Sequence, residues 1–149
     1  LNPASQRFDG VFGLWYGKGP GVDRAGDALK HGNAYGSSPH GGVLVVAGDD
    51  HGCVSSSMPH QSDQVFQSWH MPIVAPADVS ELVSFGLYGY ALSRYSGAWA
   101  GLAALSEVVE STTTVSSSTA SASWPSSGWR TGGSGAATWR SQRCSSCCR

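Results

Sequence analysis

The stretch Gly42-Val43-Leu44-Val45-Val46-Ala47 decides the fold of this chain. It is apolar and β-branched, and it lacks the alternation of polar and apolar residues that a half-exposed strand shows. Parallel sheets bury such strands on both faces. The run ends at Gly48-Asp49-Asp50-His51-Gly52, so polar side chains follow the strand directly. We therefore expect an α/β fold with its chemistry at the carboxyl edge of a parallel sheet.

Strands and helices alternate along the rest of the first 110 residues. Residues 10–16 are an apolar and aromatic run between glycines, which predicts a buried strand. Asp23 can cap a helix over residues 24–34. The later elements are a polar loop over 48–63, a short helix within 59–69, a strand at 71–74, a helix after Asp78 and a strand within 99–105. The alternation predicts a partial doubly wound, mostly parallel sheet.

The helix after Asp78 has the clearest start signal. Asp78 and Glu81 have the spacing of a capping box, with Asp in place of the usual Ser or Thr. Its predicted apolar stripe comprises Val79, Leu82, Val83, Leu87, Tyr90 and Ala91.

The composition divides the chain near residue 110. Residues 1–110 contain all ten acidic side chains, all five histidines and nearly all the large aliphatic residues. Residues 111–149 contain twelve Ser, three Trp and four Arg, but no Asp, Glu, Lys, Leu, Ile, Phe or Met. Such a segment cannot bury enough apolar surface to offset its ordering entropy. We expect a partial α/β domain over residues 1–110 and a disordered Ser/Arg/Trp-rich tail over residues 111–149.

The three tryptophans of the tail are unusual for a linker rich in Ser and Gly. A shifted reading frame explains them, because GC-rich codons read one base out of register replace Val, Leu, Asp and Glu by Ser, Arg, Trp and Cys. A basic, aromatic arm for single-stranded nucleic acid is the weaker interpretation, since four Arg without Lys give little support. We expect no nucleic-acid partner.

The beginning of the chain carries no targeting signal. Residues 1–6 lack the charged and apolar regions of a signal peptide, and no apolar run approaches the roughly 20 residues of a membrane span. We expect a cytoplasmic protein without a membrane partner. Because the first residue is Leu1, we also expect the chain to begin inside a longer protein.

Three common ligand-binding motifs are absent. The segment Gly13-x-x-x-Gly17-Lys18-Gly19 has one residue too few between its glycines for a phosphate-binding P-loop and lacks the Ser or Thr after the lysine. Gly19-Pro20-Gly21 lacks the third glycine of a dinucleotide fingerprint, and no Gly-x-Ser-x-Gly elbow occurs. The sequence therefore argues against a nucleoside triphosphatase, a dinucleotide-binding enzyme and an acyl hydrolase that use these motifs.

The polar segment after the buried strand holds the candidate site residues. His51 and His60 are the candidates for proton transfer, because imidazole titrates near neutral pH. Ser55-Ser56-Ser57 could bind an anion through hydroxyls and backbone amides. Ordinary hydrogen bonding within a polar loop remains the alternative. The residues of metal-ligand type match no zinc or calcium spacing, so we expect no metal; they are Asp49, Asp50, His51, Cys53, His60, Asp63 and His70.

Three segments occur in order with suitable spacing: FDGVFGLWYGKGPGVDR over residues 8–24, GGVLVVAGDDH over 41–51 and SSSMPHQSD over 55–63. Together they resemble the indolepyruvate ferredoxin oxidoreductase family. Its members are thiamine diphosphate-dependent 2-oxoacid:ferredoxin oxidoreductases. The resemblance covers roughly residues 8–110. Gly19-Pro20-Gly21 before a helix is also similar to the turn in pyrimidine-binding domains of thiamine diphosphate enzymes.

The resemblance implies oxidative decarboxylation of 2-oxoacids to acyl-coenzyme A, with electrons passing through iron–sulfur clusters to ferredoxin. Thiamine diphosphate with magnesium carries the difficult step in such enzymes. By the resemblance, Gly19, Pro20 and Gly21 flank the aminopyrimidine of the cofactor. The resemblance assigns the segments Asp49–His51 and Ser55–Gln61 to the substrate side, and these include Asp50, Ser56 and His60.

Parts of the family pattern are missing. The family's glutamate that activates the cofactor lies upstream, and no Glu precedes Glu81 here. The diphosphate and magnesium site and the cluster cysteines belong to other domains. The resemblance thus implies an internal fragment that is inactive and binds no cofactor alone, with the remaining domains of its parent enzyme as partners. Two alternatives stay open: a stand-alone α/β module that binds a small acid, and a non-functional product of a broken gene.

Overall fold

The computed structural model of this chain describes residue 5 and residues 7–114. Its elements are β1 Phe12–Lys18, α1 Gly19–Tyr35, β2 Gly42–Asp49, α2 Asp63–Ser68, β3 Ile73–Val74, α3 Val79–Ser96, β4 Ala100–Leu105 and α4 Ser106–Val109. The strands pair in parallel in the order β1-β2-β4-β3. The predicted α/β fold with a parallel sheet is confirmed. The tail that is predicted to be disordered, residues 111–149, lies outside the described part from residue 115 onward.

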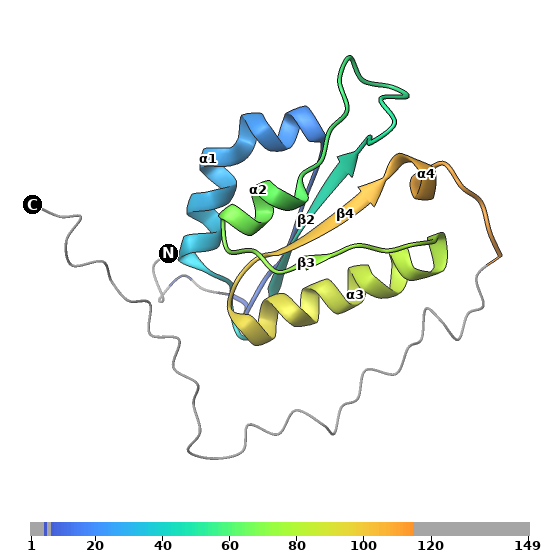
Figure 1. The fold of residues 1–149 in the computed structure, drawn as a ribbon. Helices are drawn as coiled ribbons and strands as arrows, with labels where there is room; N and C mark the ends of the chain where they lie inside the picture. The colour runs from blue at the N-terminus through green and yellow to red at the C-terminus, as the bar shows by residue number, and fades with distance from the viewer. Residues whose placement is uncertain (1–4, 6, 115–149) are drawn as a thin grey trace, which may run out of the picture.

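Helices cover both faces of the sheet (Figure 1). On one face, α1 and α2 bring Val22 and Phe66 into a cluster with Val45 of β2. On the other face, α3 packs over Leu44 and Leu102. β2 is therefore enclosed by apolar residues on each side, as its uninterrupted apolar run predicts.

β1 departs from the prediction of a buried strand. Phe12, Leu14 and Tyr16 are 56, 59 and 78% exposed, whereas Trp15 on the opposite face packs against the core below α1. The cause is position, because β1 is an edge strand. α3 meets it near Phe12, where the ring of Tyr90 packs edge to face with centroids 5.4 Å apart. Leu14 and Tyr16 lie beyond this cover.

α1 starts five residues earlier than predicted, at Gly19. Lys18 is the N-cap and Pro20 lies in the first turn, where its fixed φ and missing N–H cost nothing. Asp23 is therefore inside the helix and does not cap it. The glycine-proline-glycine segment is the first helical turn and follows β1 directly.

α3 begins as predicted. Asp78 Oδ1 accepts a hydrogen bond from Glu81 N at 2.8 Å, and Glu81 Oε2 accepts one from Ala77 N at 2.9 Å. Gly97, in the left-handed conformation, ends the helix.

The buried face of α3 is rotated relative to the predicted stripe. Leu82, Phe85 and Tyr90 pack on the sheet, but Val83 and Leu87 are exposed. None of the described helices is long and apolar enough to cross a lipid bilayer.

Candidate functional site at the carboxyl edge of the sheet

The carboxyl ends of β1 and β2 lie side by side. Lys18 pairs with Gly48, and Asp49 and Asp50 follow directly. Residues 50–62 then form a loop that projects from this edge before α2 begins (Figure 1). His60 N donates to Asp50 O at 3.0 Å, so the two limbs of the loop are joined at its base.

Asp49 holds the returning limb of the loop. It is only 2% exposed. Its Oδ2 accepts a hydrogen bond from Ser62 N at 2.8 Å, and its Oδ1 accepts one from Ser62 Oγ at 2.7 Å. The same Oδ1 lies 3.3 Å from His60 Nδ1. The two hydrogen bonds from Ser62 therefore fix the orientation of the buried carboxylate that contacts the imidazole.

His60 lies between two carboxylates. On its other side, Nε2 is 3.0 Å from Asp23 Oδ2 on α1. The ring also lies directly against Gly19, where any Cβ would overlap its atoms. The imidazole can reach both Asp23 and Asp49 because Gly19 has no side chain.

The surroundings of His60 favour the imidazolium. Burial lowers the pKa of the imidazole, but the hydrogen bonds and charges of Asp23 and Asp49 outweigh it and leave the pKa raised. Both ring nitrogens face carboxylate oxygens, and only the doubly protonated ring can donate to both.

Asp50 holds the outgoing limb. Its two carboxylate oxygens accept hydrogen bonds from Val54 N at 2.9 Å and Ser55 N at 2.8 Å. The amides of Ser55 and Val54 lower the pKa of Asp50 despite its burial, and the charge of Lys18 acts in the same direction. Lys18 Nζ also donates to Ser55 O. The carboxylate of Asp50 thus organises the loop and is turned away from bulk solvent.

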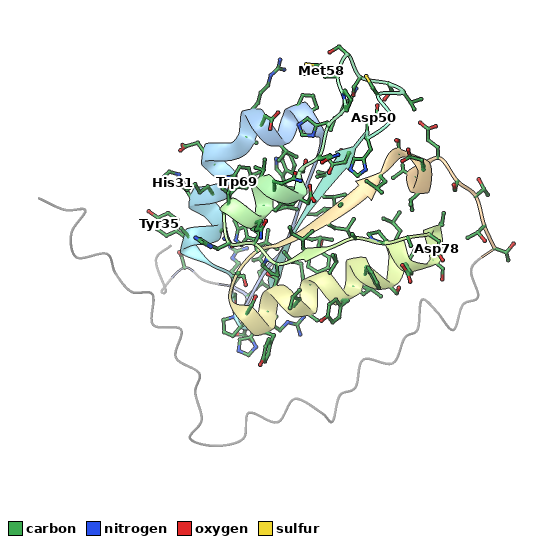
Figure 2. The ribbon with its side chains drawn as sticks, viewed as in Figure 1. His31, Tyr35, Asp50, Met58, Trp69 and Asp78 are labelled. Atoms are coloured by element: carbon green, nitrogen blue, oxygen red, sulfur yellow. The ribbon has the colours of Figure 1, made fainter. Side chains whose placement is uncertain are left out.

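The remaining predicted site residues differ in surroundings. Ser56 is half-buried, and its carbonyl accepts from Cys53 Sγ at 2.8 Å. Pro20, His51 and Gln61 are exposed, and no hydrogen bond to the His51 ring occurs within the described residues. Figure 2 shows Met58 on the projecting part of the loop and Asp50 nearer the sheet.

The structure therefore brings together one part of the predicted set. His60 contacts both Gly19 and Asp49, and in the same loop the carboxylate of Asp50 accepts a hydrogen bond from Ser55 N. The predicted roles of these residues in catalysis and binding stay predictions.

Two residues of this site were not predicted. Asp23 meets His60 because it lies one helical turn after Gly19, a spacing that places both on one face of α1. Pro20 is the sequence signal for the earlier start of α1. That start places Gly19 and Asp23 one turn apart in the same helix. Ser62 orients Asp49 from thirteen residues away, and no local pattern marks it.

Metal ligation finds no support in the arrangement of residues 7–114. No group of three or more His, Cys, Asp and Glu there could hold a metal ion. The carboxylates nearest His60 are instead turned to the imidazole itself.

Comparison with known proteins finds no relative of this chain. The chain matches no family model, no curated protein and no solved structure.

Proposed function

We propose that this chain is a segment of a thiamine diphosphate-dependent 2-oxoacid:ferredoxin oxidoreductase of the indolepyruvate type, in the part that meets the pyrimidine ring. The contact between Gly19 and His60 carries the proposal. It joins the glycine-proline-glycine segment to the loop after Asp49, which are the segments that the resemblance assigns to cofactor and substrate. They meet at the carboxyl edge of a parallel sheet, where α/β proteins bind ligands.

The first turn of α1 fits a ring that approaches the backbone closely. A Cβ at Gly21 would meet nothing within 4 Å, so that side of the turn is open. Pro20 and Gly21 would flank the aminopyrimidine directly, and Gly19, which is buried against the His60 ring, would hold that ring beside it. Thiamine diphosphate supplies the electron sink for decarboxylation when it is bound. Its diphosphate, magnesium and the iron–sulfur clusters would be held by the remaining domains of the parent enzyme, which would also meet coenzyme A and ferredoxin.

His51 is the proposed proton-transfer residue on the substrate side. Its ring is exposed and is not engaged by a neighbouring carboxylate, unlike the ring of His60. His51 follows Asp50 directly in the chain. The carboxylate of Asp50 is held by two backbone amides, so the backbone next to His51 is anchored. A free imidazole on an anchored backbone can meet a substrate without first breaking an internal contact.

A stand-alone module for a small acid is the weaker proposal. The cationic groups of this site are the imidazole of His60, which the carboxylates of Asp23 and Asp49 neutralise, and Lys18, whose charge acts on the carboxylate of Asp50. A small acid bound by this chain alone would therefore find no unpaired cation among these residues, whereas in the parent enzyme the remaining domains would supply one for the 2-oxoacid.

The nucleotide sequence of the source locus tests the proposal directly. We expect a glutamate-bearing segment of the same enzyme upstream, and a one-base shift near codon 116 that restores an acidic, aliphatic-rich continuation. A frame that is properly started and stopped, between unrelated genes, would reject the proposal and favour the stand-alone module. A broken frame within the expected enzyme would keep the ancestry and assign no activity to the fragment.

Kinetics of the intact parent enzyme test the role of His51. We expect His51→Ala to lower kcat at least about tenfold, since general acid–base catalysis contributes at least this much. His40→Ala is the matched control, because His40 is also exposed but precedes β2 at the opposite edge of the sheet. Unchanged turnover in His51→Ala would remove this residue from the site.

A further inference from the structure

Two side-chain contacts tie the 50–62 loop to the junction of β1 and α1. Lys18 Nζ donates to the carbonyl of Ser55, and His60 Nε2 meets Asp23 Oδ2. The first uses a neutral backbone oxygen. The second joins two titratable side chains, so its strength depends on the protonation of the imidazole.

We propose that His60 is a positioning residue that fastens the 50–62 loop to the first turns of α1, and that it does so only while both ring nitrogens carry protons. The role rests on the contacts of His60 with Asp23, Asp49 and Gly19, and it does not depend on the function proposed above.

Loss of one proton breaks one particular contact. The neutral ring has a single N–H, so a lone pair on the other nitrogen must face a carboxylate oxygen. Asp49 is almost fully buried and is held by two hydrogen bonds from Ser62, so it cannot turn away. The side chain of Asp23 is 57% exposed and is free to swing into water. Deprotonation therefore keeps Nδ1–H on Asp49 and releases Asp23.

The direction of the pH dependence follows. The pKa of His60 is raised, because Asp23 and Asp49 outweigh the effect of burial. The stabilising contribution is complete below the pKa of an unfolded histidine, about 6.5, and is lost as the pH rises through the higher folded value. The other ionisable groups of the loop and of the segments that meet it are Lys18, Asp50, His51, Asp63 and Glu107, whose carboxylate lies near Gly52. The pKa of Asp50 is lowered by the amides of Ser55 and Val54, so its carboxylate does not titrate in this range.

Hydrogen exchange of the full chain, measured by mass spectrometry from about pH 5 to about pH 8, tests the role. Exchange rates are corrected for the intrinsic effect of pH. We expect the loop amides to lose protection as the pH rises, while the amides of β2 stay protected. In Asp23→Asn, we expect loop exchange at low pH to be faster by about two- to fivefold, the factor typical of a solvent-accessible ion pair.

Asp27→Asn is the matched control for Asp23→Asn. Asp27 lies one turn further along α1 and also pairs with a histidine, His31, with 3.3 Å between Nδ1 and Oδ1. That pair is exposed and distant from the loop in sequence, so the same substitution should leave loop exchange unchanged. Equal effects of the two substitutions would overturn the proposal, and so would loop protection that is independent of pH in the wild-type chain.

His60→Gln provides the second variant. Glutamine keeps hydrogen-bonding groups but does not titrate, so loop protection should become independent of pH and match the wild-type value at high pH. A pH course like that of the wild type would show that another group controls the loop. Protection of β2 amides reports whether this variant is folded, and if it is not, Asp23→Asn decides alone.

Discussion

At the scale of single residues, the missing side chain at Gly19 keeps the His60 imidazole in place. Alanine normally stabilises a helix relative to glycine by about 0.5–1 kcal/mol. Here a Cβ would overlap the ring, so the steric effect should prevail and Gly19→Ala should lower the free energy of unfolding by about 1–3 kcal/mol. Urea denaturation of the full chain measures this. Gly21→Ala is the control: its Cβ would meet nothing within 4 Å, so stability should be equal or slightly higher. Similar losses in both variants would contradict the contact.

The same residues show what the sequence could predict about the site. Asp49 and His60 were predictable, because polar residues after a buried parallel strand gather at its carboxyl edge. Asp23 was predicted to be a helix cap because aspartate favours that position, and its partnership with His60 depends on where α1 begins. Ser62 becomes visible only when the loop closes on Asp49. Local signals thus locate the loop, whereas its internal contacts depend on the path of the chain in space.

At the scale of elements, α3 depends on its N-cap. Asp78→Ala removes the acceptor for Glu81 N and should lower the free energy of unfolding by about 1 kcal/mol. Asp63→Ala is the matched control, because Asp63 lies in the first turn of α2 and its N-cap, Ser62, makes no side-chain capping bond. Only a charge interaction with the helix dipole is lost there, about 0.3 kcal/mol. Thermal unfolding compares the two, and an equal shift in Tm would argue against the cap.

The elements were predicted unequally well for a physical reason. The start of α3 and the burial of β2 follow from local chemistry, namely a capping spacing and an unbroken apolar run. The exposure of β1 does not, because burial depends on what packs over a strand. Its aromatic and apolar residues predict a strand, and its place at the edge of the sheet decides how much of it is covered.

At the scale of the whole molecule, β1 is an edge strand with no strand on its outer side within the described residues, and one of its faces exposes apolar side chains. Edge strands with free backbone groups and apolar side chains pair readily with other chains. We expect the full chain to self-associate as its concentration rises, and Leu14→Lys to reduce this, because a charge on an edge strand opposes pairing. Leu14 is already 59% exposed, so the substitution should cost little stability.

Sedimentation velocity over a concentration series measures the average mass. Met58→Lys adds the same charge on the projecting loop, where the side chain is 72% exposed, and should leave association unchanged. If both variants associate like the wild type, the contact lies elsewhere; if both reduce association equally, net charge rather than the edge of β1 controls it.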